Sequence, residues 1–488
     1  MFLSKTDYLK GLDCVKGLWL FKNRKDLVPP TDEALQRRFD IGNTVQEIAR
    51  KRYPTGILVQ SENYNVFEDA LRTQSLSKKH DILFEATAYI PNGAFCRIDI
   101  MEKRGSKWGL IEIKSATEVK DEYIDDLAFQ KYVFTQSGYP IGCCKVLHIN
   151  SDYVREKELD IDKLFTLEDV SDLVDEKFCN VPAFVDQFLK IQAQSSEPEI
   201  YLKSACRKCP FYAYCGKDVP EYSVFDLLRA KSKQADVFYA KFNSLRVEDV
   251  PVSYCSTPTQ LIDREAYLTG QIHVEPDEIQ SFLSTLTYPL YYLDFETAQL
   301  AIPLFENSHP YDQIPFQYSL HIQHQKGGEL EHLGYLHRKK SDPRRKLAEQ
   351  LIQDCGETGS IVAYNATFEM TRIKELAALF PDLSDKLLAL NTRMVDQLIP
   401  FRRRALYSPK QKTSASIKYV LPAFSDLSYK DMEVHNGSEA MSRYQAFLEN
   451  RLTPEEEQVL FDGLDAYCGQ DTYAMVVLMK VLYQYATT

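Results

Sequence analysis

Three cysteines lie close together near the middle of the chain, at the spacing C-x2-C-x5-C: Cys206, Cys209 and Cys215. Thiolates at this spacing can reach one metal, and a set of thiolates suits an iron–sulfur cluster (4Fe–4S) or Zn2+. A fourth ligand is missing locally, and Cys14, close to the N-terminus, is the best candidate for it. A site closed by Cys14 would tie the beginning of a domain to its end. The alternative is three ordinary cysteines in a helical hairpin.

A second group combines two acids with a lysine. Asp99 lies in one expected strand, and Glu112 and Lys114 lie in the next. Because side chains alternate along a strand, Glu112 and Lys114 point to the same face. Two carboxylates can hold Mg2+ or Mn2+ against a scissile phosphate, while the lysine positions water and offsets the developing charge. The alternative is an exposed acidic and basic ladder on an edge strand, since such triples arise by chance in many chains.

A third group is spread over the second half of the chain. Asp294 and Glu296 end an apolar strand, and their i, i+2 spacing directs both carboxylates to one face. Glu369 begins a helix after a later strand, and the last helix carries Tyr467 and Asp471 on one side. Four acids in this order can hold two divalent ions. The alternative is a similar fold that is kept as a binding module.

Hydrophobic periodicity places these groups on regular elements. In the first half we expect an early helix that includes Cys14, followed by a helix over 32–52, strands over 82–90, 95–101 and 108–114, a helix over 121–137 and a strand over 142–149. Residues 225–285 are expected to be mostly helical, over 225–243, 257–268 and 277–286. The second half is expected to contain strands over 289–297, 316–322, 330–337 and 360–365, and a long last helix.

Composition limits the class of protein. A chain of 488 residues with 44% hydrophobic and 26% charged residues is typical of a globular protein with two or three domains. It contains no apolar run of membrane-spanning length and no signal peptide at its start, so we expect a cytoplasmic location in which cysteines stay reduced. The net charge of −12 argues against an indiscriminate nucleic-acid coat, but it leaves room for a nuclease with a local basic surface.

The first half, over about residues 1–220, resembles the RecB-like branch of the PD-(D/E)xK nucleases. With its four cysteines it is similar to the four-cysteine iron–sulfur nucleases of this branch. The resemblance implies that Asp99, Glu112 and Lys114 carry metal binding and catalysis. It also implies that Gln130 is the first residue of the family's helical Q-x3-Y motif.

Two positions depart from the pattern of that family. Phe134 stands where the motif has tyrosine, and Tyr132 is a candidate substitute. Gln46 stands where the family has a metal-binding histidine. Glu47 or Glu85 could replace this histidine, or either could be a plain surface or hairpin residue, which is the interpretation that we favour. These departures bear on the activity of the site rather than on its fold.

The second half resembles the DnaQ-like 3′–5′ exonucleases of the DEDDy type over about 200 residues. The matching motifs are D-x-E at Asp294 and Glu296, N-x3-[DE] at Asn365 and Glu369, and Y-x3-D at Tyr467 and Asp471. In detail the chain is similar to an uncharacterised bacterial exonuclease-like family that is often fused behind RecB-like domains. Glu369 is a longer variant of the usual aspartate.

The resemblance implies a mechanism with two ions about 4 Å apart. Asp294, Glu296 and Asp471 would hold the ions, and Glu369 would contribute to the second one. One ion activates water and the other stabilises the leaving 3′-oxygen, while Tyr467 orients the water. Asp396 is expected to cap a helix entry rather than to support the metal site.

The sequence therefore predicts an α/β protein of three parts: a PD-(D/E)xK restriction-endonuclease-like core with a metal staple over 1–225, a helical connector over 226–285, and an RNase H-like DnaQ exonuclease fold over 286–488. The predicted function is a bifunctional nuclease that depends on Mg2+ or Mn2+ and acts on nucleic acid, DNA in preference to RNA. The alternative is a nucleic-acid-binding adaptor with one or both sites inactive. No glycine-rich phosphate loop is present, so a helicase or a defence system would be a separate partner.

Overall fold

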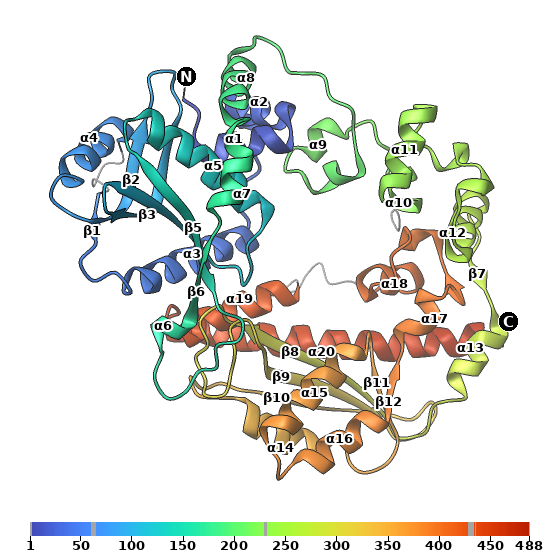
Figure 1. The fold of residues 1–488 in the computed structure, drawn as a ribbon. Coiled ribbons are helices and arrows are strands. Elements are labelled where there is room, and N and C mark those ends of the chain that lie inside the picture. The colour runs from blue at the N-terminus through green and yellow to red at the C-terminus, as the bar shows by residue number, and fades with distance from the viewer. Residues whose placement is uncertain (1, 60–64, 229–231, 428–433, 435, 488) are drawn as a thin grey trace. The chain divides into compact units, whose positions relative to one another are not determined.

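The computed structural model describes residues 2–59, 65–228, 232–427, 434 and 436–487. It shows a mixed α/β protein that divides into two compact units (Figure 1). Unit 1 consists of Met1–Tyr201, Lys208–Cys215 and Leu300–Tyr311. Unit 2 consists of Leu202–Arg207, Gly216–Gln299 and Asp312–Thr488. The segment that joins the first two long strands of unit 2 is therefore part of unit 1.

Unit 1 is built on a six-stranded sheet in the order β1-β2-β3-β4-β5-β6. Its strands are β1 (Ile57–Leu58), β2 (Ile82–Tyr89), β3 (Phe95–Arg104), β4 (Lys107–Lys114), β5 (Ile141–Ile149) and β6 (Phe165–Asp169). The expected hairpin is present, with Gly93 at φ 102° in the turn between β2 and β3. Strands β4 and β5 are parallel, and α5 (Asp121–Gln136) provides the crossover that such a pair needs.

Unit 1 also contains helices that pack on this sheet or on one another. They are α1 (Lys5–Asp13), α2 (Val15–Asn23), α3 (Glu33–Arg50), α4 (Val66–Leu76), α5, α6 (Ile161–Leu164), α7 (Ser171–Phe178), α8 (Val181–Ala193) and α9 (Tyr212–Cys215). The prediction that Cys14 lies within one early helix was wrong. Cys14 is extended, with φ −163°, and separates α1 from α2. Its sulfur accepts a hydrogen bond from the Gly17 amide at 3.3 Å, so the residue acts as an N-cap that starts a new helix.

Unit 2 begins with short helices, the first two of which contribute Phe225 and Phe238 to a separate hydrophobic cluster. The helices are α10 (Val224–Leu227), α11 (Ser232–Phe242), α12 (Pro258–Thr269) and α13 (Pro276–Leu283). The helical character predicted for residues 225–285 is thus observed, with residues 229–231 outside the described part of the chain. A small antiparallel pair of β7 (His273–Val274) and β13 (Leu406–Tyr407) links this region to the rest of unit 2.

The main sheet of unit 2 has the order β10-β9-β8-β11-β12. Its strands are β8 (Leu290–Gln299), β9 (Gln313–Gln323), β10 (Leu330–Leu336), β11 (Ser360–Ala363) and β12 (Met394–Asp396). Strands β10, β9 and β8 form an antiparallel meander, whereas β8, β11 and β12 are parallel. The strand over 289–297 and the hairpin that follows it are therefore confirmed.

Helices pack on both faces of this sheet (Figure 1). One face meets α14 (Arg344–Asp354), α15 (Thr367–Leu379) and α16 (Ser384–Thr392), and the other meets α13, α17 (Leu398–Arg402), α18 (Ile417–Phe424) and α20 (Pro454–Tyr485). Helix α19 (Gly437–Leu448) also contacts β8. Leu290 and Tyr292 belong to the α20 side. Because side chains alternate along β8, Asp294 and Glu296 point to this side as well.

None of the helices in the described ranges is both long enough and apolar enough to cross a membrane.

Candidate functional site

The predicted acids of unit 1 lie together with Gln130 at the centre of the sheet. The Ile113 amide donates to Asp99 Oδ2 at 2.7 Å, which links β3 to β4. Gln130 on α5 donates to Glu112 Oε2 at 2.8 Å. Lys114 Nζ lies 2.9 Å from Glu112 Oε1. The structure therefore brings together the four residues that the sequence assigned to this site.

Two further residues of this cluster were missed. Asp126, one turn before Gln130 on α5, accepts from Gln130 at 2.8 Å and from Lys114 at 2.9 Å. The i, i+4 spacing of the two residues was visible in the sequence and could have indicated a shared face. Lys5, from the first turn of α1, lies 2.6 Å from Glu112 Oε1 and 3.5 Å from Asp126 Oδ2. No local pattern indicates this lysine, since more than a hundred residues separate it from Glu112.

The departures from the family pattern have structural consequences. Gln46, at the histidine position, donates to Glu85 at 2.6 Å and to Asp99 Oδ1 at 2.8 Å. Glu85 is buried and also pairs with Arg50 and Arg97, so the interpretation of Glu85 as a plain hairpin residue does not describe its surroundings. It has φ 56° and lies opposite Asp99 where the β2–β3 register is interrupted.

The remaining candidates of unit 1 lie elsewhere. Glu47 is exposed. Phe134 is fully buried in the core, next to the ring of Tyr139. Tyr132 packs on Phe178, with the ring centroids 6.4 Å apart. Tyr132 and Phe134 of α5 thus contribute to packing.

The two main acids of unit 1 have opposite pKa shifts. Burial opposes the ionisation of Glu112, but the charges of Lys114 and Lys5 outweigh it and hold the pKa of Glu112 well below its usual range. Burial and the neighbouring Glu112 raise the pKa of Asp99 to about 7. Burial also disfavours the charged form of Lys114, yet Glu112 and Asp126 raise its pKa above the usual value. Lys114 is therefore a permanent cation here, suited to stabilising negative charge and unsuited to accepting a proton.

In unit 2, Asp294, Glu296 and Cys468 form a compact group. One ligand-type atom of each lies within 4.8 Å of the others. Cys468 is a buried residue of α20, and its sulfur lies 3.7 Å from the Asp294 carbonyl oxygen and 3.9 Å from its Oδ2. Cys468 follows Tyr467 directly in the sequence. The Y-x3-D motif specifies only the tyrosine and the aspartate, so it does not indicate this cysteine.

Glu369 completes the cluster from α15. It is 3% exposed, and its Oε2 atom finds no hydrogen-bond partner among the described residues. Asn365, in the tight turn between β11 and α15, has φ 72°. Its backbone amide donates to Asp396 Oδ1 at 2.9 Å, and the same oxygen accepts from the Leu398 amide at 3.0 Å. Asp396 thus stabilises the turn that precedes Glu369. It also accepts from an amide at the start of α17, which is the helix-entry role that the sequence predicted.

Burial raises the pKa of Asp294, Glu296 and Glu369 in unit 2, and repulsion by neighbouring acids adds to the rise. For Asp294 the shift is large, and its causes after burial are Asp471, Glu296 and Glu369. The pKa of Glu296 rises to about 8, mainly through burial and Asp471. The pKa of Glu369 also rises to about 8, mainly through burial. These causes show that the four acids converge, since each of the other three raises the pKa of Asp294.

The donors of unit 2 fit one or more divalent metal ions. Hard carboxylate oxygens are the ligands that Mg2+ and Mn2+ prefer, and an ion would supply the positive charge that the converging acids lack. The unpaired Oε2 of Glu369 is a ready ligand atom. The donors of unit 1 do not fit an ion as they stand, because each oxygen of Asp99 and Glu112 already accepts from a protein group.

Lys418 is a further residue of unit 2 that the sequence analysis did not assign. Its ammonium lies 5.4 Å from the ring centroid of the buried Tyr467. Its charge opposes the rise in the pKa of Glu296. Lys418 is the second residue of α18. The amphipathic pattern over 417–424 could have indicated that this helix has a face directed towards α20.

Three of the four predicted cluster cysteines lie in unit 1. Cys209 and Cys215 pack against a small hydrophobic cluster made by Trp19, Leu20 and Phe211. Trp19 and Leu20 are residues of α2, the helix that Cys14 caps. The start of unit 1 and its segment Lys208–Cys215 are therefore packed together, as a cluster closed by Cys14 requires. Cys206 belongs to the segment Leu202–Arg207, where its sulfur accepts from the Lys203 amide at 3.4 Å.

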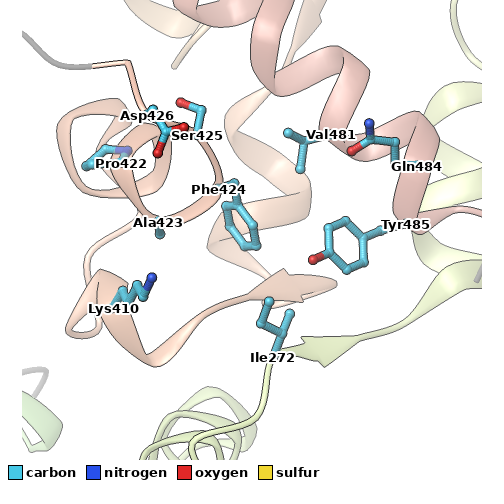
Figure 2. A pocket seen from close by; sticks show the side chains of 10 residues that line it. All are labelled: Ile272, Lys410, Pro422, Ala423, Phe424, Ser425, Asp426, Val481, Gln484 and Tyr485. Atoms are coloured by element: carbon cyan, nitrogen blue, oxygen red, sulfur yellow. The ribbon is translucent and has the colours of Figure 1, made fainter.

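A separate hollow of about 340 Å3 lies on unit 2 (Figure 2). It is lined by the rings of Phe424 and Tyr485 and by aliphatic and polar side chains, among them Lys410 and Asp426. Of the described residues that line it, none is one of the four converging acids.

Comparison with known proteins gives a partial family match. Residues 291–416 match a family described as a domain of unknown function (DUF2779). The chain is similar to an uncharacterized protein, UU173 of Ureaplasma parvum serovar 3, with 23% identity over 291 residues that cover 55% of this chain and 40% of that protein. It is also similar to the uncharacterized protein MG366 of Mycoplasma genitalium, with 26% identity over 208 residues that cover 38% of this chain and 31% of that protein. The chain thus spans less than half the length of these relatives.

Proposed function

We propose that the protein is a nuclease that requires divalent metal ions, and that residues 286–488 contain a 3′–5′ exonuclease of the DnaQ-like DEDDy type. The observation that carries the proposal is the convergence of Asp294, Glu296, Glu369 and Asp471, in which each of the other three acids raises the pKa of Asp294, together with an unpaired Glu369 oxygen. The strand order β10-β9-β8-β11-β12 and the helix α20 across it support an RNase H-like fold.

In this proposal each residue has a definite task. Asp294, Glu296, Glu369 and Asp471 would hold Mg2+ or Mn2+, which activates water and stabilises the leaving oxygen when bound. Tyr467 orients the attacking water with its hydroxyl group. Lys418, beside Tyr467 and within electrostatic reach of Glu296, attracts the phosphate of the substrate.

Unit 1 is proposed to be a RecB-like domain with a second phosphodiester site at Asp99, Glu112, Lys114 and Gln130. The crossover β4–α5–β5 and the residues gathered around Glu112 support this assignment. Lys114 would stabilise the charge that develops on the phosphate. The alternative function, a nucleic-acid-binding adaptor, predicts binding without cleavage at either site.

The test is the stepwise shortening of strands labelled at the 5′ end, in Mg2+ or Mn2+, for single and double strands of DNA and RNA. The Lys114→Ala variant should still produce a ladder, and the Asp294→Ala, Lys114→Ala double variant should not. A ladder that persists in the double variant would place the chemistry elsewhere. Binding of all substrates without shortening by the unaltered protein would favour the adaptor.

The cysteine cluster is proposed to be 4Fe–4S, with Zn2+ as the alternative. The packing of Cys209 and Cys215 against α2, the helix that Cys14 caps, supports Cys14 as the fourth ligand of the site. Anaerobically purified protein should be brown and contain iron and sulfide. Cys14→Ser should lose the metal and lower the melting temperature, whereas Cys179→Ser, at an exposed cysteine, should change neither. Colourless protein with stoichiometric zinc would replace iron–sulfur by zinc.

A further inference from the structure

The acid cluster of unit 1 already contains the cations that balance its charge. Glu112 and Asp126 are buried carboxylates, at 2% and 1% exposure. The ammonium groups of Lys5 and Lys114 both lie near them, at 2.6 and 2.9 Å from Glu112 Oε1 and at 3.5 and 2.9 Å from Asp126 Oδ2. Two carboxylates thus face two ammonium groups. Buried charges that are paired in this way resist the removal of either partner.

The backbone at Lys5 is fixed by hydrogen bonds of the residues that precede and follow it in the chain. Ser4 and Asp7 form a capping box at the start of α1, with hydrogen bonds of 2.9 Å from the Ser4 amide and 3.2 Å from the Asp7 amide. The buried Leu3 pairs with the β2–β3 hairpin, since its amide donates to Gly93 and its carbonyl oxygen accepts from Phe95. The lysine therefore extends from a fixed backbone.

A divalent ion at Glu112 would have to share this space. An ion of the size of Mg2+ lies about 2.1 Å from a carboxylate oxygen. At that distance from Glu112 Oε1 it would meet the ammonium groups of Lys5 and Lys114, which lie 2.6 and 2.9 Å from the same oxygen. Like charges this close repel strongly at a buried site. Lys114 extends from the same strand as Glu112, whereas Lys5 comes from a separate helix.

We propose that the Lys5 ammonium is the resident cation of the unit 1 cluster, and that a divalent ion binds Glu112 by displacing it. Lys5 then sets the metal affinity of this site. The site takes up an ion only when the ion, together with its water or substrate ligands, outcompetes the lysine. This proposal concerns ion binding at Glu112 in unit 1. Its test is therefore independent of whether unit 2 is an exonuclease.

The first test measures Mn2+ binding by the loss of the free-ion electron paramagnetic resonance signal. The full chain is used with the unit 2 site disabled by Asp294→Asn and Glu296→Gln. In this background Lys5→Met should bind Mn2+ at least about tenfold more tightly, since one repelling charge is gone. Adding Glu112→Gln should remove the gain. Lys5→Arg, which keeps the charge, and Lys10→Met, on the same helix but with its ammonium over Phe21, should show no gain. Equal affinity in the Lys5→Met and parent proteins would overturn the proposal.

A second measurement leaves Lys5 unaltered and so does not depend on the folding of a Lys5 variant. Amine acylation followed by mass spectrometry reports how accessible Lys5 is, with Lys10 as an internal reference in the same helix. Saturating Mn2+ should increase the labelling of Lys5 relative to Lys10 several-fold in the background described above, because the displaced ammonium reaches solvent. Labelling that is unchanged by Mn2+ would contradict displacement.

Discussion

In unit 1, Glu112 and Asp126 face Lys5 and Lys114, and Glu85 faces Arg50 and Arg97. In unit 2, Asp294 and Glu296 face two other acids, Glu369 and Asp471, and the charges of these two raise the pKa of both Asp294 and Glu296.

The two clusters use the same carboxylate chemistry but balance their charge differently. The first is balanced by its own lysines, as the lowered pKa of Glu112 records. The second holds carboxyls with raised pKa values, an arrangement that a bound cation would relieve. A row of acids in a sequence therefore does not by itself define a metal site. The cations that surround the acids decide how readily an ion enters.

The largest expected effect is the loss of exonuclease activity when an acid of the unit 2 cluster is neutralised. Glu369→Gln should reduce 3′ shortening by about 10²–10³-fold, because the amide keeps the shape but cannot supply the charged ligand that two-ion catalysis uses. Glu375→Gln, an exposed residue of the same helix, is the matched control and should be nearly neutral. Initial rates of ladder formation in Mg2+ measure both. Equal rates for the two variants would remove Glu369 from the site.

Breaking the charge balance of unit 1 should cost stability as well as activity. Lys114→Met should lower the free energy of unfolding by about 1–3 kcal/mol, because the buried Glu112 and Asp126 lose a partner. Cleavage by unit 1 should fall by about 10²-fold. Lys145→Met, which removes a partner of the half-exposed Asp169 on the next strand, should cost less than about 0.5 kcal/mol. Denaturant titrations compare the two, and similar costs would mean that the cluster is not a balanced buried network.

The pH dependence of stability should have one sign for the acids with raised pKa values, which are Asp99 of unit 1 and Glu296 and Glu369 of unit 2, and the opposite sign for Glu112 of unit 1. In protein freed of divalent ions, Glu296 and Glu369 stay protonated in the folded state up to a pKa of about 8, far above that of an unfolded glutamate. Their contribution is therefore complete at pH values below the unfolded pKa and is lost as the pH rises through 8. The melting temperature should fall by a few degrees between pH 6 and 9.

Two controls sharpen that measurement. Mg2+ or Mn2+ should restore the melting temperature at pH 9. The Glu296→Gln, Glu369→Gln variant should show a smaller dependence, which comes from the remaining acids with raised pKa values, Asp99 and Asp294. Glu112, with its lowered pKa, acts in the other direction, since its contribution is present above the unfolded pKa and is lost as the pH falls below it. A melting temperature that rises from pH 6 to 9 without metal would contradict the assignment of charge in unit 2.

The smallest effect concerns the lysine of unit 2. Lys418→Met should slow 3′ shortening by about tenfold, because a positive charge near the acids attracts the phosphate. The loss should shrink in Lys418→Arg. Lys410→Met removes an exposed lysine from the rim of the hollow in Figure 2 and should leave the rate unchanged. Rates at low and high salt distinguish steering, which salt screens, from a contact with the reacting phosphate.

The sequence by itself determined the local parts of this protein. Four local features could be predicted from alternation, helical spacing and turn residues within a few positions. They are the D-x-E pair of β8, the turn and helix over Asn365–Glu369, the Tyr467–Asp471 pair of α20, and the hairpin that contains Asp99. Such patterns record how a short segment meets the core, so they can be recognised without the rest of the fold. The mixed α/β class followed from the same patterns.

Tertiary structure decided which charges meet. Lys5 reaches Glu112 across more than a hundred residues, and Gln46 reaches Asp99 from another helix. Cys14 separates two helices instead of lying within one, because its sulfur caps α2. Periodicity identifies which side of an element is buried but not what it is buried against. Because electrostatic energies depend on that partner at a distance of a few ångströms, the charge balance that distinguishes the two clusters became visible only in the folded chain.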